Sequence, residues 1–266
     1  MKAVSLDLDT EDLAQLYERV SADRQFKAGR RLIEELKVSV GESILDLGCG
    51  TGLLAEYIAG IVGTGGSVTG IDPLPLRIEI AQGRARPNLS FKTGNAYDLS
   101  GFAPATFDAV CLNAVFHWLP EKKEPLRQIY RVLKSGGRIG ISTGAKGSPN
   151  PLHEIKQRVL SRESYKEYSA AAQTAVHRVS AEELSSLLIE AGFTIQALEE
   201  RPSPQPQLAP EAAIRFSEAS SFGNFLGHLP AKLRERARED LKRELEQTDV
   251  RASRERLRLI AIAVKP

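Results

Sequence analysis

The sequence has few cysteines, no excess of either charge and no long apolar run. Its 266 residues include two cysteines, Cys49 and Cys111, too few to form a disulfide framework. Lys and Arg number 36 against 34 Asp and Glu, so no net field attracts the chain to nucleic acid or to an anionic membrane. No apolar run approaches the roughly 20 residues that span a bilayer. These absences favour chemistry on a small molecule.

The amino terminus also lacks a targeting signal, because MKAVSLDLDTEDLAQL carries acids where a signal peptide needs an apolar core. We therefore expect a cytoplasmic protein with both thiols reduced. We expect a small-molecule partner, no binding to nucleic acid or membrane, and no metal site. The segment KLRERAREDLKRELEQ has nearly balanced charges at helical spacing and predicts a solvated helix. The oligomeric state is not predicted.

Apolar runs alternate with helical patterns through the first half of the chain. Helices are expected at about 53–62 and 75–84, and a third carries Leu126, Ile129, Tyr130 and Leu133. The runs between them predict strands at 43–47, 67–71, 89–93, 107–112 and 138–143. Alternation of this kind predicts a parallel sheet that is covered by helices on both faces.

The flanking segments follow a different rhythm. Two amphipathic helices precede the first strand, and a helical region is expected at about 150–172. Ser180 and Glu183 form a capping-box pattern at the start of another helix, with a strand expected at 193–199. The proline-rich stretch RPSPQPQLAP favours an extended connector over regular structure. Two further helical stripes follow, and LRLIAIAVK predicts a final strand.

The stretch ILDLGCGTG places three glycines at alternate positions behind a short apolar strand. Glycines in this place allow a tight turn with its backbone close to a ligand. A dinucleotide fingerprint needs its third glycine at position 53, which is leucine, and no Walker-type Gly-Lys-Ser/Thr is present. The pattern is instead Asp46-x-Gly48-x-Gly50-x-Gly52. An acid in the strand suits a ligand whose end is cationic.

This pattern resembles the first motif of the class I S-adenosylmethionine-dependent methyltransferases, and the resemblance runs from about Tyr17 to the last strand. It implies S-adenosylmethionine as cofactor. It also implies a Rossmann-like, doubly wound α/β fold with a mostly parallel seven-stranded sheet and an antiparallel last strand. The implied parts are N-terminal helices over the cofactor at 1–40, a cofactor-binding core at 41–200, a helical cap at 201–252 and the last strand at 253–266.

The same resemblance implies a set of cofactor-binding residues. Asp72, which ends the second expected strand, would accept both ribose hydroxyls, although it could also cap the following helix. Asn95 replaces an acid that is usual in the family, and it could still contact the adenine edge. Asn113 would border the methionine part. The full set is Tyr17, Asp46, Gly48, Cys49, Gly50, Gly52, Asp72, Pro73, Leu74, Asn95, Ala96 and Asn113.

The segment NAVFHWL follows the fourth expected strand, at the carboxyl end where open α/β sheets bind ligands. It is similar to the matching segment of small-molecule carboxyl methyltransferases such as those of trans-aconitate and juvenile hormone acid, which favours Phe116, His117 and Trp118 as substrate-binding residues. His117 is the catalytic candidate, because it could orient a carboxylate or take a proton from a hydroxyl. A structural histidine and a packing tryptophan are the alternatives.

The expected cap offers Phe222 and Phe225 as acceptor-binding residues, in a lid over an apolar acceptor or in a simple docked helix. The sequence thus predicts O-methylation of a small molecule, with a carboxylate favoured, by in-line methyl transfer. N- or C-methylation and an inactive cofactor-binding scaffold remain alternatives. Position 53 argues against an NAD-dependent oxidoreductase.

Overall fold

The chain forms two compact units, each of which draws on separate stretches of sequence. The computed structural model describes residues 10–148, 151–168, 176–204, 208–220, 226–248 and 255–266. The sheet unit comprises residues 22–147, 176–201 and 257–266. The helical unit comprises residues 1–21, 148–175 and 202–256.

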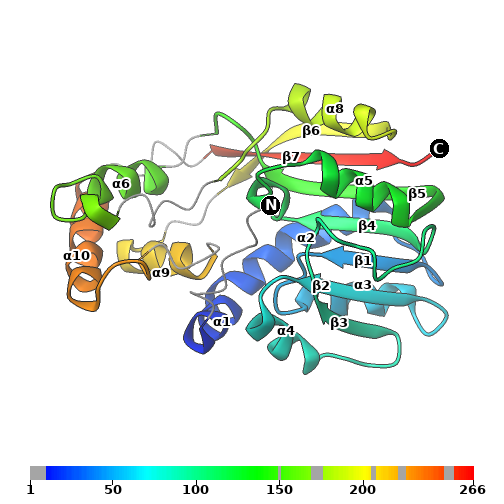
Figure 1. Ribbon diagram of the computed structural model, residues 1–266, viewed down its shortest axis with the longest axis horizontal. Helices are drawn as coiled ribbons and strands as arrows, with labels where there is room; N and C mark the ends of the chain where they lie inside the picture. The colour runs from blue at the N-terminus through cyan, green and yellow to red at the C-terminus, as the bar shows by residue number, and fades with distance from the viewer. Residues whose placement is uncertain (1–9, 149–150, 169–175, 205–207, 221–225, 249–254) are drawn as a thin grey trace. The chain divides into compact units, whose positions relative to one another are not determined.

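The sheet unit is built on seven strands (Figure 1). In spatial order they are β3 (Leu89–Thr93), β2 (Ser67–Asp72), β1 (Ser43–Leu47), β4 (Phe107–Asn113), β5 (Leu133–Gly144), β7 (Glu255–Val264) and β6 (Thr194–Pro204). The pairs from β3 to β5 are parallel, whereas β7 runs antiparallel to β5. This order confirms the predicted doubly wound fold and its antiparallel last strand. Since β1 lies between β2 and β4, the order reverses direction there, at the position where open α/β sheets bind ligands.

Helices cover the sheet with two separate apolar clusters. One cluster contains residues of α2 (Asp23–Leu36), α3 (Leu53–Val62) and α4 (Pro75–Gln82). The other contains residues of α5 (Lys123–Val132), α8 (Ala181–Glu190) and the 3-10 turn η2 (Phe116–Trp118). Alternate residues of β5 belong to different faces, since Ile139 and Ile141 join the α5 cluster while Gly140 lies against α2.

The helical unit contains α1 (Glu11–Tyr17), α6 (Pro151–Leu160), α9 (Pro210–Ser220) and α10 (Ala231–Gln247), and a π-helical turn η1 (Glu18–Ala22) follows α1. Its own apolar core includes Leu226 and Leu229, which are fully buried. An ion pair and a hydrogen bond stabilise it: Arg238 donates to the buried Glu218 at 3.0 Å, and the Tyr165 hydroxyl donates to Asp240 at 2.8 Å.

Two local predictions were wrong. Leu133, expected in a helix, is instead the first residue of β5, because α5 ends at Val132. The start of the proline-rich stretch is not a connector, since β6 continues through Pro202 to Pro204. Because β6 is the outermost strand of the sheet, a proline there can lack its N–H without breaking a ladder on its outer side.

The predicted capping box at Ser180 is confirmed and gives a stability test. Ser180 Oγ accepts from Glu183 N at 3.2 Å, and Glu183 Oε2 accepts from Ser180 N at 2.8 Å. Ser180→Ala leaves a first-turn N–H without its acceptor and should lower the free energy of unfolding by about 1 kcal/mol in urea titrations. Ser186→Ala, at an exposed site within α8, should change it by less than about 0.5 kcal/mol. Equal effects would contradict the capping role.

Candidate functional site

The glycine loop lies at the carboxyl end of β1, and its shape depends on the absence of side chains. Gly48 has φ of 81°, and a Cβ there would lie 2.2 Å from Val115 Cγ2. Gly52 has φ of 89°, and a Cβ would lie 2.7 Å from the Phe91 ring. Both the left-handed conformation and the close contacts exclude larger residues at these two positions. The two glycines therefore let Val115 and Phe91 pack directly against the loop backbone.

Asp72 fixes the loop to β2. Its buried carboxylate accepts from Gly50 N through Oδ2 at 3.0 Å and from Leu74 N through Oδ1 at 3.0 Å. The second bond ends on the N–H of Leu74, the N-cap residue of α4, and not on an N–H of its first turn, so the capping interpretation of Asp72 is not confirmed. Each carboxylate oxygen has two acceptor sites, so the predicted contact with ribose hydroxyls is compatible with these bonds and stays a prediction.

Asp46 is a buried carboxyl group next to the loop. Its Oδ1 accepts from the Cys111 thiol at 3.4 Å, whereas the buried Oδ2 has no hydrogen-bond partner in the part of the chain that the structure describes. Burial raises the pKa of Asp46 to about 7, the Cys111 bond lowers it, and the charge of Asp72 raises it further. Ionising Asp46 therefore costs stability as pH rises from about 4 towards 7. A cationic ligand group would supply the missing donor.

The two thiols belong to packing and not to chemistry. Cys49 and Cys111 are free and buried. Burial raises the pKa of each thiol well above its usual value, and the charge of Asp46 raises both further. Because the thiolate is the nucleophilic form, neither group is activated.

Asn113 ends β4 and connects three elements. Its Nδ2 donates to the carbonyl of Gln25 in α2 at 2.8 Å, and its Oδ1 accepts from Arg258 of β7 at 3.4 Å. The next residue, Ala114, has φ of 59°, and its N–H donates to the carbonyl of Ser142 at 2.8 Å. Asn113 thus lies at the same sheet edge as Asp46, where a shared ligand could reach both.

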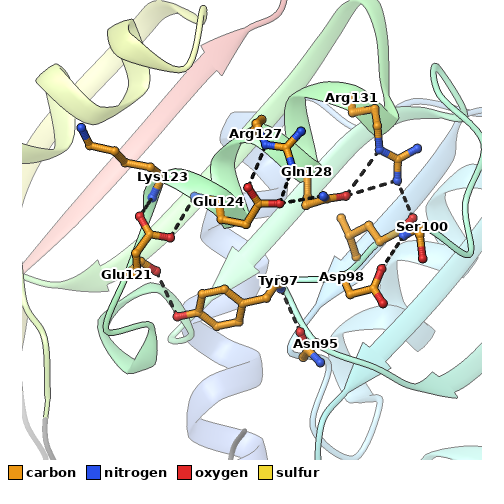
Figure 2. Close-up of polar contacts among 11 residues, drawn as sticks. Asn95, Tyr97, Asp98, Ser100, Glu121, Lys123, Glu124, Arg127, Gln128 and Arg131 are labelled. Carbon is orange, nitrogen blue, oxygen red and sulfur yellow. Dashed lines mark hydrogen bonds and ion pairs between the residues drawn. The ribbon is translucent and has the colours of Figure 1, made fainter. Parts of the chain in front are cut away.

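Asn95 follows β3 and has an exposed side chain. Its Oδ1 accepts from Tyr97 N at 2.9 Å, which closes a tight turn, while Ala96 is buried. Figure 2 shows that Tyr97 continues this chain of contacts, because its hydroxyl donates to the carbonyl of Glu121 at 3.0 Å before α5. The loop after β3 is therefore tied to the start of α5, and the predicted adenine contact of Asn95 stays a prediction.

His117 lies in η2 with its ring half-buried beside Trp118, at 4.9 Å between ring centroids. Its Nδ1 is 2.9 Å from Thr143 Oγ1. Burial, followed by the positive charges of Arg258, Arg178 and Lys122, lowers the pKa of His117 to about 3. The ring is consequently neutral near pH 7. A ligand bond to His117 would use Nε2, because Nδ1 faces Thr143.

The turn that carries His117 is held by a lysine that the sequence did not single out. Lys122 Nζ donates to the carbonyl of Phe116 at 3.2 Å and also to that of Leu119. Burial lowers the pKa of Lys122 to about 8. Phe116 is fully buried in the α5 cluster, so it packs this turn from inside. Phe116 therefore anchors the turn, and its predicted role in substrate binding stays a prediction.

Three predicted residues are not part of this sheet edge as described. Tyr17 is the last residue of α1 and belongs to the helical unit. Phe222 and Phe225 lie outside the described residues. Conversely, sequence reasoning missed Arg24, Arg178 and Arg258, although a lone arginine inside the apolar run LRLIAIAVK was a signal that could have been followed.

Comparisons with known proteins agree with this geometry. The methyltransferase domain family matches residues 45–141. Mouse arsenite methyltransferase is 33% identical over 144 residues, which cover 50% of this chain and 37% of that protein. The 2-phytyl-1,4-naphtoquinone methyltransferase of Synechococcus elongatus is 32% identical over 187 residues, which cover 68% of this chain and 74% of that protein. The YcgJ structure from Bacillus subtilis shares the fold, with a TM-score of 0.61 and 17% identity over 90% of this chain and 98% of that one.

The chain belongs to the class I S-adenosylmethionine-dependent methyltransferases, and S-adenosylmethionine is its cofactor. The residues present fit this ligand, because Asp46 Oδ2 has no donor among the described residues and a cationic group could supply one. Within the described residues, no group of three or more His, Cys, Asp or Glu could hold a metal ion, and no helix is long and apolar enough to cross a membrane.

Asp46 Oδ2 has no hydrogen-bond partner among the described residues, and we therefore predict that cofactor binding is linked to the release of protons. At pH 6 Asp46 is mostly protonated in the free protein, and a cationic amine beside it would favour the carboxylate. S-adenosylmethionine binding should therefore release protons at pH 6, and its affinity should rise with pH until about 7. Calorimetry in two buffers of different ionisation enthalpy measures this release.

Asp46→Asn should abolish the proton release, whereas Asp98→Asn should preserve it, because Asp98 lies in an exposed turn after β3. The absence of any release in the unmodified protein would show that the cofactor does not contact Asp46.

Proposed function

We propose that the chain transfers the methyl group of S-adenosylmethionine to an oxygen atom of a small-molecule acceptor, with a carboxylate favoured. The observation that carries this proposal is the position of His117, which is neutral and half-buried at the carboxyl end of β4. The proposed acceptor site lies in this turn, with His117 and Trp118 as contacts. Acceptor choice is proposed to depend on residues 211–246, including Phe222 and Phe225.

The chemistry requires alignment more than covalent help. The cofactor supplies a methyl group on a positively charged sulfur. A carboxylate acceptor is ionised above about pH 5, so no base is needed, and His117 would hold it with an Nε2 proton. This role requires that the Thr143 hydroxyl donates to Nδ1, so that the ring carries its proton on Nε2. The half-buried turn would also limit water around the reacting atoms.

A second class of acceptor has support from a relative. The Synechococcus protein is named for a phytylated naphthoquinone, which has no nitrogen, so its name supports C-methylation of a metabolite as an alternative proposal. N-methylation remains an alternative without that support. An inactive scaffold that retains the cofactor site is the third. We further propose a cytoplasmic protein without a nucleic-acid or membrane partner, because its net charge is only +2.

Cofactor binding is tested through Asp72. Asp72→Ala removes acceptors for the ribose hydroxyls. It should weaken the binding of S-adenosylmethionine and of S-adenosylhomocysteine by about 1–3 kcal/mol in calorimetric titrations. Asp98→Ala, at the exposed turn, should change neither affinity. Melting temperatures without ligand separate this effect from loss of the bonds to Gly50 and Leu74. Tighter binding of NAD than of either adenosyl compound would overturn the assignment.

The pH profile of turnover separates the acceptor classes. With a carboxylate acceptor and saturating S-adenosylmethionine, so that the ionisation of Asp46 does not limit cofactor binding, the rate should be flat from about pH 5.5 to 7.5, because burial lowers the pKa of His117 to about 3 and the acceptor is already ionised. His117→Gln should then lower kcat/KM by about tenfold or less, through loss of orientation.

An alcohol or phenol acceptor would behave differently. Its proton must leave, so the rate should rise with pH and His117→Gln should cost about 10²–10⁴-fold. His153→Gln serves as the control, since His153 lies in α6 of the helical unit, outside the proposed acceptor site. Unchanged turnover in His117→Gln would show that this histidine has only a structural role.

A further inference from the structure

Three consecutive residues at the end of β5 each lie beside a basic side chain from a different part of the sheet unit. Ser142 Oγ accepts from Arg258 of β7 at 2.9 Å, and Thr143 Oγ1 is 2.9 Å from His117 Nδ1. At Gly144, an added Cβ would lie 3.4 Å from Nε of Arg178. The small side chains of this strand end therefore leave room for two guanidinium groups.

The two arginines share one face of the sheet. Gly144 is the register partner of Arg258, and directly opposed residues in an antiparallel pair project to the same face. Arg178 lies where a Gly144 side chain would project, so it occupies that face too. The face is the one covered by α2, which carries Arg24.

The backbone around Arg178 holds it in place. His177 N donates to the carbonyl of His117 at 2.8 Å, and Lys146 N donates to the carbonyl of Val179 at 2.9 Å. Val179 also forms a parallel bridge with Ala145. Arg178 is thus fixed between two backbone anchors, one on η2 and one directly after β5.

The environment of Arg258 is basic and its hydrogen-bond acceptors are neutral. Its NH1 donates to Ser142 Oγ and to Asn113 Oδ1, neither of which carries charge. Burial and the charge of Arg24 lower the pKa of Arg258 to about 10. Burial lowers the pKa of Arg178 and of Arg24 as well. Placing like charges together in a partly buried site is unfavourable unless an anion joins them.

Other arginines of the same unit have carboxylate partners. Arg138 of β5 donates to both oxygens of Glu42 at 2.8 Å, and Arg201 of β6 pairs with Glu35 and Glu199. Arg258 differs from them in having hydroxyl and amide oxygens as its acceptors. Its guanidinium therefore has the chemistry of an open anion site, because planar forks of this kind bind carboxylates in bidentate fashion.

We propose that Arg258 and Arg178, with Arg24 beside them, bind a carboxylate group of the methyl acceptor, so that the substrate is an organic acid. This inference rests on the proposed methyl transfer and adds the group by which the acceptor is held. A carboxylate there would lie at the carboxyl end of β5 on the α2 face, whereas Thr143, the partner of His117, projects to the opposite face at the same strand end. If this is the group that is methylated, the ester product has lost its charge, and its release is thereby favoured.

The methionine part of the cofactor carries a carboxylate of the same chemistry. Its amine and carboxylate share one carbon, so both must lie within a few ångströms of each other, near Asp46 if that residue takes the amine. Neighbouring strands are about 4.8 Å apart, which places β5 roughly 10 Å and β7 roughly 14 Å from β1. These are backbone distances, and the Arg258 side chain reaches Asn113 on β4, the neighbour of β1, so the experiment must distinguish the two sources of carboxylate.

The test uses succinate as the probe, on the full chain saturated with S-adenosylhomocysteine. Succinate should bind with a dissociation constant in the millimolar range, measured by NMR titration, and uncharged succinamide should not bind. Arg178→Gln and Arg258→Gln should each lower the affinity for succinate at least tenfold and change the affinity for S-adenosylhomocysteine less than threefold. Arg201→Gln, at a paired arginine of the same unit, should change neither.

The outcomes separate the two sources of carboxylate. If the two variants lower the affinity for S-adenosylhomocysteine and leave the affinity for succinate unchanged, the arginines bind the cofactor and the proposal is wrong. Equal binding of succinamide, or no binding of succinate, also overturns it. Should a glutamine variant fail to fold, Arg178→Lys and Arg258→Lys keep the charge and should still weaken succinate about threefold or more through loss of the planar fork. Failure of the unmodified protein to bind S-adenosylhomocysteine would refute the proposed function instead.

Discussion

The site depends on the buried carboxylate of Asp72 and on the hydrogen bonds that it accepts from two backbone N–H groups. One bond holds the glycine loop after β1, and the other holds Leu74, the residue before α4, after β2. Backbone bonds from Gly48 N and Cys49 N to the carbonyl of Ile71 in β2 support the same loop. The cost of burying the charge of Asp72 is offset by its charge-assisted bonds, which are stronger than neutral ones. Asp46 on the next strand accepts from the Cys111 thiol through Oδ1, and burial raises its pKa to about 7.

The sheet order then separates charge along one edge. Asp46 and Asp72 end β1 and β2, whereas Arg258 and Arg178 lie at β7 and beyond the end of β5. Asn113 on β4 lies between the two groups and bonds towards the basic one. A cationic methyl donor suits the acidic half and an anionic acceptor suits the basic half. Under the proposals made above, transfer would take place between them, near β4.

Local sequence signals predicted the elements well and the long-range pairings poorly. The strands at 43–47 and 89–93 and the capping box at Ser180 follow from neighbours within a few residues, and all are confirmed. The extension of β6 through Pro202 could not be predicted, because proline is tolerated there only since β6 is the outermost strand of the sheet. The contact of Arg258 with Ser142 joins residues 116 positions apart, so no local pattern reveals it.

The basic half also explains why His117 is poorly suited to strong base catalysis. The charges that would attract an anion, those of Arg258 and Arg178, also disfavour a proton on the ring. A bound carboxylate would cancel part of that field and raise the pKa of His117, yet burial, the largest cause, would remain. The ring would still be neutral near pH 7 and would accept a proton only weakly. A site built this way favours an acceptor that arrives already ionised, which is the property of a carboxylate and not of an alcohol.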